Sequence, residues 1–169
     1  MKAKALPPLE ELKEVLDYNP DTGILTWTKK PCKNIEIGQE AGSLKPNGYR
    51  HIQFKRERWH TNRLVYYMYH GIDPLEKEVD HINRNRLDNR IENLRLVTPS
   101  QNLMNSGSYK NNTSGFKGVY WDKIKKNWRT LIIVNGKRIQ LGSFINKEDA
   151  IKARKEAEIK YFGDFRRRD

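Results

Sequence analysis

The sequence predicts an α+β protein, and three observations support this fold class. Residues 79–105 have the pattern of a strand, an irregular loop, a second strand and a helix. Residues 114–163 have the pattern of three antiparallel strands followed by one helix. Between these segments, residues 106–113 consist mostly of Ser, Gly, Asn and Thr, which is typical of a linker. We therefore expect two parts, the second being a three-stranded antiparallel sheet packed on one helix.

Upstream of residue 79, apolar spacing predicts two helices and two strands. The first helix has its leucines and valine on one face, and the second ends before Gly71, a common helix stop. In chain order the predicted elements are a helix at Leu6–Tyr18, a strand at Ile24–Thr28, a strand at Tyr49–Phe54 and a helix at Asn62–His70.

The segment 79–105 divides into four elements. Val79–Ile82 and Leu94–Val97 are short and apolar enough for strands, and Asn83–Asn93 between them indicates a loop. Thr98 followed by Pro99 is typical of a helix start, with Thr as the N-cap and Pro in the first helical position.

The segment 114–163 carries strong boundary signals. Asn135-Gly136 predicts a tight hairpin, and Asn146 and Gly163 bound a helix of about sixteen residues. The three predicted strands are Gly115–Trp121, Trp128–Val134 and Lys137–Phe144. The expected organisation is a first domain at 1–105 with its core at about 78–105, a linker at 106–113, a second domain at 114–163 and a basic tail at 164–169.

The charge balance favours a polyanionic partner. The chain has 169 residues and a net charge of +12. Residues 1–110 contain 18 Lys and Arg against 14 Asp and Glu, a net of +4, whereas residues 111–169 contain 15 against 7, a net of +8. A compact basic domain of this kind favours nucleic acid, the alternative being a solvated basic surface. Arg166, Arg167 and Arg168 would add non-specific affinity.

Cysteine usage and hydropathy exclude several classes. Cys32 is the single cysteine, so an intrachain disulfide and a cysteine-based zinc site are excluded, and a reducing cytoplasm is expected. No apolar run reaches the roughly 18–20 residues that a membrane span needs, and residues 1–9 lack the apolar core of a signal peptide.

One stretch concentrates groups suited to phosphodiester hydrolysis. Residues 79–105 contain six asparagines, two aspartates and one histidine. Asp80 and Asn102 supply oxygen ligands of the kind that Mg²⁺ prefers, His81 can serve as general base, and Asn93 can orient the histidine or hold the loop. An alternative is that the asparagines serve turns and that the Asp-His pair has no catalytic role. Adjacent residues of a regular strand also face opposite ways, so a shared site needs the strand to end or distort there.

These residues resemble the HNH endonucleases, in particular the phage and intron-borne homing type. The resemblance spans roughly residues 9–105, and its central motif is highly specific. The matching residues are Asp80-His81-Ile82-Asn83, Leu87-Asp88-Asn89-Arg90, Glu92-Asn93-Leu94-Arg95, Thr98, Asn102 and Asn105. The resemblance implies a ββα-metal unit in which Asp80 and Asn102 bind Mg²⁺ or Mn²⁺, His81 is the general base and Asn93 supports it. Relatives often have His where this chain has Asn62, and His60 lies two residues earlier.

The second part resembles the Apetala-two/ethylene-response-factor type of DNA-binding domain. The matching residues are Ser114-Gly115-Phe116-Lys117-Gly118-Val119, Trp128, Leu141-Gly142-Ser143-Phe144, Glu148-Asp149-Ala150 and Phe162-Gly163. Members contact the major groove through one face of the three-stranded sheet, which here would present Lys117, Tyr120, Arg129, Arg138 and Gln140. Tyr120 and Gln140 differ from the usual contact residues, so the target sequence does not transfer. Leu131 and Ile133 fall on the same face, where they would contact thymine methyls or pack on the linker.

The combined interpretation is a metal-dependent endonuclease that nicks or cuts duplex DNA and is targeted by its C-terminal domain. The arginines expected to contact phosphates near the cut are Arg63, Arg84, Arg86 and Arg90. For Arg84 and Arg86 a solvated loop is the alternative. The partner would be double-stranded DNA in the cytoplasm of a phage host, with no membrane or protein partner implied, and the enzyme would be a monomer or a homodimer. The main alternative is a DNA-binding regulator with an inactive nuclease site, and a weaker one is a binder of structured RNA.

Overall fold

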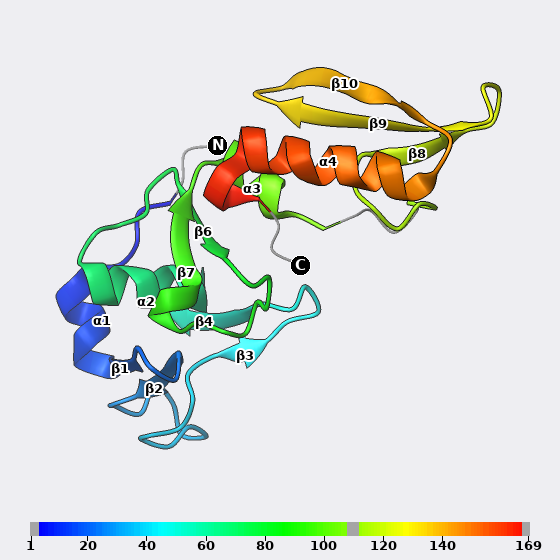
Figure 1. The fold of residues 1–169 in the computed structure, drawn as a ribbon. Helices are drawn as coiled ribbons and strands as arrows, with labels where there is room; N and C mark the ends of the chain where they lie inside the picture. Colours follow the sequence, from blue (N-terminus) through cyan, green and yellow to red (C-terminus); the bar gives the residue numbers. More distant parts are fainter. Residues whose placement is uncertain (1–3, 108–111, 167–169) are drawn as a thin grey trace. The chain divides into compact units, whose positions relative to one another are not determined.

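The computed structural model of the protein describes residues 4–107 and 112–166 (Figure 1). The chain forms two compact units, Met1–Pro99 and Ser100–Asp169. Helices and small antiparallel sheets occur in both, which confirms the α+β class. Helix α3, expected at the end of the first domain, begins at the unit boundary and falls mainly in the second unit, and the domain boundaries stay predictions. No helix within the described ranges is both long and apolar enough to cross a membrane.

The first unit contains three antiparallel sheets, which pair as β1–β2, β3–β4–β5 and β6–β7. Its core gathers apolar side chains from all of them, with Leu12, Ile52 and Leu64 fully buried. The elements follow in the order α1 Leu9–Val15, β1 Leu16–Asn19, β2 Ile24–Trp27, β3 Ser43–Leu44, β4 Arg50–Phe54, β5 Glu57–His60, α2 Thr61–His70, β6 Glu78–His81, η1 Ile91–Asn93 and β7 Leu94–Val97.

The predicted helix at Leu6–Tyr18 is wrong at its C-terminal end. Helix α1 stops at Val15, and Leu16–Asn19 pairs instead with Ile24–Trp27 as a hairpin. The hairpin buries Leu16 and Leu25, so tertiary packing overrides the helical period of the sequence.

Strands β3 and β5 were not predicted. Residues Lys55 and Arg56 form the turn between β4 and β5 with φ of 49° and 64°, and neither is the Gly or Asn that usually indicates such a hairpin. Helix α2 confirms its prediction, because it ends at His70 and Gly71 follows in the left-handed conformation with φ 69°.

The second unit contains α3 Pro99–Asn105, which straddles the boundary, and a sheet of order β10–β9–β8 with α4 on one face. Val119, Thr130 and Ile132 are buried on the face toward α4, together with Ala150 and Ala157. The strands and helices are β8 Val119–Asp122, β9 Asn127–Val134, β10 Lys137–Phe144, α4 Lys147–Phe162 and η2 Gly163–Phe165. Three antiparallel strands followed by one helix confirm the predicted element pattern.

The first predicted strand of this unit, Gly115–Trp121, begins too early. Strand β8 starts at Val119, because Gly115 and Gly118 adopt positive φ of 76° and 79° and form a turn instead. A side chain at Gly118 would meet the carbonyl oxygen of Leu131 at 2.5 Å, so only glycine lets the turn lie against β9.

Candidate functional site

Asp80 and His81 are the last two residues of strand β6, and the loop to strand β7 begins directly after them. The antiparallel register of the two strands sets Asp80 opposite Arg95 and His81 opposite Leu94. Strand β6 ends with His81, so the loop begins directly after this residue, and a site shared by Asp80 and His81 stays a prediction. Asp80 and His81 are 8% and 3% exposed, so both polar side chains need partners within the protein.

The imidazole of His81 is fixed by Asn89 and packed by Tyr49. Nε2 of His81 lies 3.0 Å from Oδ1 of Asn89, which is itself 4% exposed. Because an amide oxygen only accepts hydrogen bonds, Nε2 carries the proton and Nδ1 is the nitrogen that can take one. The ring of Tyr49 lies 5.9 Å from the imidazole, centroid to centroid. The geometry therefore selects one tautomer of His81.

Burial sets the charge state of this histidine. It lowers the pKa of His81 below its usual value, with a smaller contribution from Arg86. The hydrogen bond to Asn89 and the nearby carboxylates Asp80 and Asp88 raise the pKa and only partly oppose burial. His81 is therefore neutral near pH 7, the state that a general base needs.

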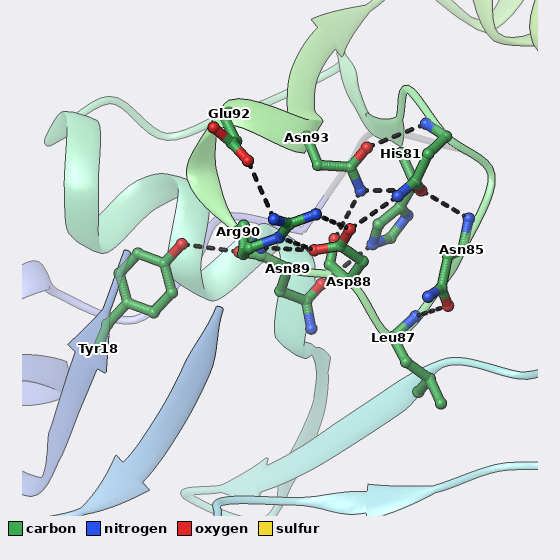
Figure 2. Close-up of polar contacts among 10 residues, drawn as sticks. Tyr18, His81, Asn85, Leu87, Asp88, Asn89, Arg90, Glu92 and Asn93 are labelled. Carbon is green, nitrogen blue, oxygen red and sulfur yellow. Dashed lines mark hydrogen bonds and ion pairs between the residues drawn. The ribbon is translucent and has the colours of Figure 1, made fainter. Parts of the chain in front are cut away.

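Asn93 ties together the loop that begins after His81 (Figure 2). Its Oδ1 accepts the backbone N–H of Asn83 at 3.0 Å, and its Nδ2 donates to Oδ1 of Asn83 at 3.0 Å and to the carbonyl of Asp88 at 2.7 Å. The carbonyl of Asn93 also accepts the N–H of Ile82 at 2.9 Å. Asn93 thus fixes the loop at Ile82, Asn83 and Asp88. Within the described residues its side chain makes no hydrogen bond to His81.

Asp88 and Arg90 form a second anchor in the same loop. Both carboxylate oxygens of Asp88 accept from Arg90, at 2.9 Å from Nε and 2.8 Å from Nη2. Asn83 donates to the same carboxylate at 2.7 Å. Arg90, followed by the hydrogen bond from Asn83 and the backbone N–H of Arg90, holds the pKa of Asp88 down to about 2 despite partial burial. The guanidinium of Arg90 also pairs with Glu92 at 3.2 Å.

Asp80 has the oxygen chemistry that Mg²⁺ prefers and is held by Arg95. Nε and Nη2 of Arg95 donate to Oδ2 of Asp80 at 3.0 and 2.9 Å. Asn102 lies on α3 in the second unit, so its approach to Asp80 stays a prediction. Within residues 4–107 and 112–166 no group of three or more His, Cys, Asp or Glu gathers as a metal site. The predicted ligands, one carboxylate and one carboxamide, fit a magnesium ion that keeps several of its waters.

Two predicted phosphate contacts already have partners in the first unit. The guanidinium of Arg63 donates to the carbonyls of Lys77 and Leu75 at 2.8 and 3.0 Å, which fixes the segment before β6. Arg90 is held by Asp88 and Glu92 but keeps 43% of its side chain exposed. Arg90 is thus better placed than Arg63 to meet a phosphate, and both contacts stay predictions.

The sheet of the second unit gathers most of the other predicted contacts on one face. Tyr120 is paired with Arg129, Ile133 with Arg138 and Leu131 with Gln140. These residues alternate with the buried Thr130 and Ile132, so they lie on the face away from α4. Tyr120 is 38% exposed, Arg138 and Gln140 are exposed, and Arg129 is half-buried with Asp122 3.4 Å away.

Lys117 lies outside that face. Its ammonium donates to the carbonyl of Leu103 and to Oγ of Ser106, both at 2.6 Å, at the C-terminal end of α3. These contacts complement the negative end of the helix. Its predicted role in DNA binding stays a prediction.

Three residues near the site were missed in the sequence. A turn was the alternative role for Asn83, Asn85 and Asn89. The side chains of Asn83 and Asn85 accept backbone N–H groups two residues ahead, whereas that of Asn89 bonds His81. Arg95 could have been found only from the register of β6 and β7. The third, Tyr18, reaches the loop from 71 residues upstream. Asn62, by contrast, has a structural role, because its Nδ2 donates to the carbonyl of Val79 at 2.8 Å.

A buried Asp-His pair at a strand end, followed by an asparagine-tied loop and a second strand, defines a candidate nuclease site. Residues 60–104 match the family model described as HNH endonuclease. The chain therefore carries an HNH endonuclease domain and is a nuclease.

Two viral proteins are similar to this chain. It is 36% identical over 85 residues to Protein 3.8 of Escherichia phage T7, covering 50% of this chain and 69% of that protein. It is 31% identical over 116 residues to the uncharacterized HNH endonuclease L560 of Acanthamoeba polyphaga mimivirus, covering 68% of this chain and 59% of that protein. No solved structure matches the chain.

Proposed function

We propose that this protein is a metal-dependent endonuclease of the homing type that hydrolyses phosphodiester bonds in duplex DNA. The observation that carries the proposal is the buried, neutral His81, fixed in one tautomer by Asn89 and placed beside the carboxylate of Asp80. The match of residues 60–104 to HNH endonucleases supports the reaction class.

His81 is the general base in this proposal. With the proton on Nε2 held toward Asn89, Nδ1 accepts a proton from the attacking water. As the imidazole becomes charged, Asp80 and Asp88 stabilise it, since both already act to raise its pKa. Asn93 contributes indirectly by holding the loop that carries Asn89.

Asp80 and Asn102 would hold the divalent cation, Mg²⁺ or Mn²⁺. When bound, the cation supplies positive charge near the scissile phosphate and the leaving oxygen. Arg95 pairs with the buried carboxylate of Asp80 and orients it before the cation arrives, since a buried charge needs a partner.

The second unit would place the enzyme on its target. Its sheet face presents Tyr120, Arg129, Arg138 and Gln140, a mixture of cations and hydrogen-bonding groups suited to phosphates and base edges. The net charge of +8 over residues 111–169 supports binding to a polyanion. Similarity to Apetala-two/ethylene-response-factor domains remains part of this proposal.

The test is cleavage of supercoiled plasmid and of phage DNA with Mg²⁺ or Mn²⁺, with and without a chelator. We expect metal-dependent nicks or breaks that fall about 10²–10⁴-fold in His81→Ala. His70→Ala is the matched control, because His70 is exposed at the end of α2 and should leave the rate unchanged. Retained duplex binding without cleavage of any DNA would instead favour a regulator with an inactive site. Tighter binding to structured RNA would favour the RNA binder.

A further inference from the structure

A hairpin from the beginning of the chain touches the loop that carries Asn89. The hydroxyl of Tyr18, on β1, donates to the backbone carbonyl of Asn89 at 2.7 Å (Figure 2). Two residues further along each segment, the N–H of Ile91 donates to the carbonyl of Pro20 at 3.2 Å. The β1–β2 hairpin therefore holds the backbone on both sides of Arg90.

The turn of this hairpin fits the loop so closely that it requires glycine. Gly23 has φ of +75°, and a Cβ there would lie 2.4 Å from the backbone N of Arg90 and 2.6 Å from the carbonyl carbon of Asn89. Both atoms are backbone, so neither can rotate away. Asn19 shapes the turn, because its Oδ1 accepts the N–H groups of Asp21 and Thr22.

The hairpin is itself anchored in the core of the first unit. Leu16 and Leu25 are 2% and 1% exposed, and Leu25 is the cross-strand neighbour of Tyr18. The ring of Tyr18 packs against the same core. Burial raises the pKa of Tyr18, so its hydroxyl stays protonated and remains a donor. The β1–β2 hairpin, packed into the core, thus holds the loop through the backbone carbonyl of Asn89.

That peptide carries the partner of His81. The backbone of Asn89 is held by Tyr18, while its side chain accepts the hydrogen bond from Nε2 of His81. We propose that the β1–β2 hairpin is a brace that positions the catalytic histidine, with Tyr18 and Gly23 as positioning residues acting through Asn89. The inference rests on the proposed role of His81 as general base. It assigns to residues 16–27 a role in setting the rate of cleavage rather than in binding DNA.

A small displacement of Asn89 should be enough to lower the rate of cleavage. The Nε2–Oδ1 distance of 3.0 Å allows little movement before the hydrogen bond weakens, and misplacing a catalytic group by about 1 Å can lower a rate roughly 100-fold. Moving the hairpin should therefore reduce the maximal rate, kcat, and leave KM for DNA unchanged.

The decisive comparison is Gly23→Ala against Gly38→Ala. Gly38 has a similar φ of +82°, but nothing lies within 4 Å of the position of its Cβ. Both variants place a side chain at a similar positive φ and so carry similar backbone strain, but only Gly23→Ala brings a Cβ against the loop. We expect kcat to fall about 100-fold in Gly23→Ala and less than about twofold in Gly38→Ala. Equal losses in the two variants would overturn the brace.

A second pair of variants, Tyr18→Phe and Tyr67→Phe, removes only a hydroxyl group in each case. Tyr18→Phe deletes the donor to Asn89 and keeps the ring in the core, and we expect kcat to fall about 10-fold. The control is Tyr67→Phe, since Tyr67 packs on the same core and its hydroxyl makes no hydrogen bond with the described residues. An unchanged kcat in Tyr18→Phe would contradict a role for the hydroxyl.

A spectroscopic measurement separates failure of the brace from failure of the proposed function. Long-range ¹H–¹⁵N correlation spectra of the full-length protein report which imidazole nitrogen carries the proton. We expect His81 to show a single tautomer with the proton on Nε2 in the wild type and in Gly38→Ala, and a mixture in Gly23→Ala. The same tautomer in all three proteins would overturn the brace even if DNA is cleaved. If DNA is not cleaved but the tautomer changes, the hairpin still positions His81, and it is the proposed nuclease function that fails.

Discussion

Polar residues serve the two units of this protein in different ways. Near His81 two asparagines are buried and hydrogen-bonded within the protein: Asn89, 4% exposed, bonds His81, and Asn93, 6% exposed, bonds Asn83 and Asp88. On the sheet face of the second unit, Arg138 and Gln140 are exposed to solvent. A buried network couples its members, so that one substitution disturbs several others. Exposed contacts act nearly independently. We therefore expect substitutions of the buried residues near His81 to change both stability and cleavage rate strongly. Substitutions on the exposed sheet face should have modest, additive effects.

The second unit has a buried ion pair of its own. Substitutions there test whether a large effect on stability comes from burial or from being close to His81. Nε of Arg154 lies 2.8 Å from Oε1 of Glu158, with the two side chains 3% and 10% exposed. Nη1 of Arg154 also donates to the carbonyl of Leu131 at 2.5 Å. This pair lies on α4 and is bonded to strand β9 of the same unit, so it should matter for stability alone.

Arg154→Met should produce the largest loss of stability. It leaves Glu158 buried without its cation, which costs about 3–5 kcal/mol. Urea unfolding followed by circular dichroism measures the loss. The double variant Arg154→Met/Glu158→Leu removes both charges and should be more stable than the single variant. A double variant as unstable as the sum of its two single changes would show that the pair is not coupled.

Asn93→Ala should lower both stability and rate. Three side-chain hydrogen bonds are lost and the backbone groups of Asn83 and Asp88 are left without them, at a cost of about 2–3 kcal/mol. The loop would then hold Asn89 and His81 less firmly, so single-turnover cleavage should slow at saturating DNA. Asn85→Ala, which removes one exposed local bond, is the control and should change neither quantity appreciably.

Asp88→Asn should change how the stability of the protein depends on pH, because it removes the carboxylate that pairs with Arg90. The pKa of Asp88 is held at about 2 in the folded protein, below the roughly 3.9 of an unfolded chain. A carboxyl with a depressed folded pKa adds stability above the unfolded value and loses it as pH falls through the folded value. The variant should therefore be less stable by about 1 kcal/mol at pH 7, and the difference from wild type should shrink between about pH 4 and pH 2. A constant difference across that range would rule out the ion pair with Arg90 as its cause.

The sequence predicted those features that depend on local signals. Gly71 ended a helix as expected, and Lys137–Phe144 followed its Asn-Gly turn as a strand. What it missed depends on register and on distant contacts. Arg95 meets Asp80 only because β6 and β7 pair with that offset, and Tyr18 meets Asn89 across 71 residues. The asparagines of the loop all have the same local propensity for turns, so tertiary contacts decide which one holds His81.

The smallest expected effect lies on the open sheet face of the second unit. Arg138 is exposed, and the structure describes no salt bridge of its guanidinium within residues 4–107 and 112–166. Arg138→Ala should weaken duplex binding roughly three- to tenfold and reduce the salt dependence of log Kd by about 1, because about one phosphate contact is lost. Stability should change by less than about 0.5 kcal/mol, since the residue is on the surface.

Lys160→Ala gives the matched control for this last change. Lys160 is also exposed, but it lies on α4, whereas Arg138 belongs to the sheet face away from that helix. Both variants lose one positive charge, so a purely non-specific attraction would weaken equally in the two. A loss confined to Arg138→Ala, measured by fluorescence anisotropy at several salt concentrations, would assign DNA binding to the sheet face. Equal losses would mean that the net charge of the unit, rather than this face, attracts DNA, and the contrast between the two units would then concern burial alone.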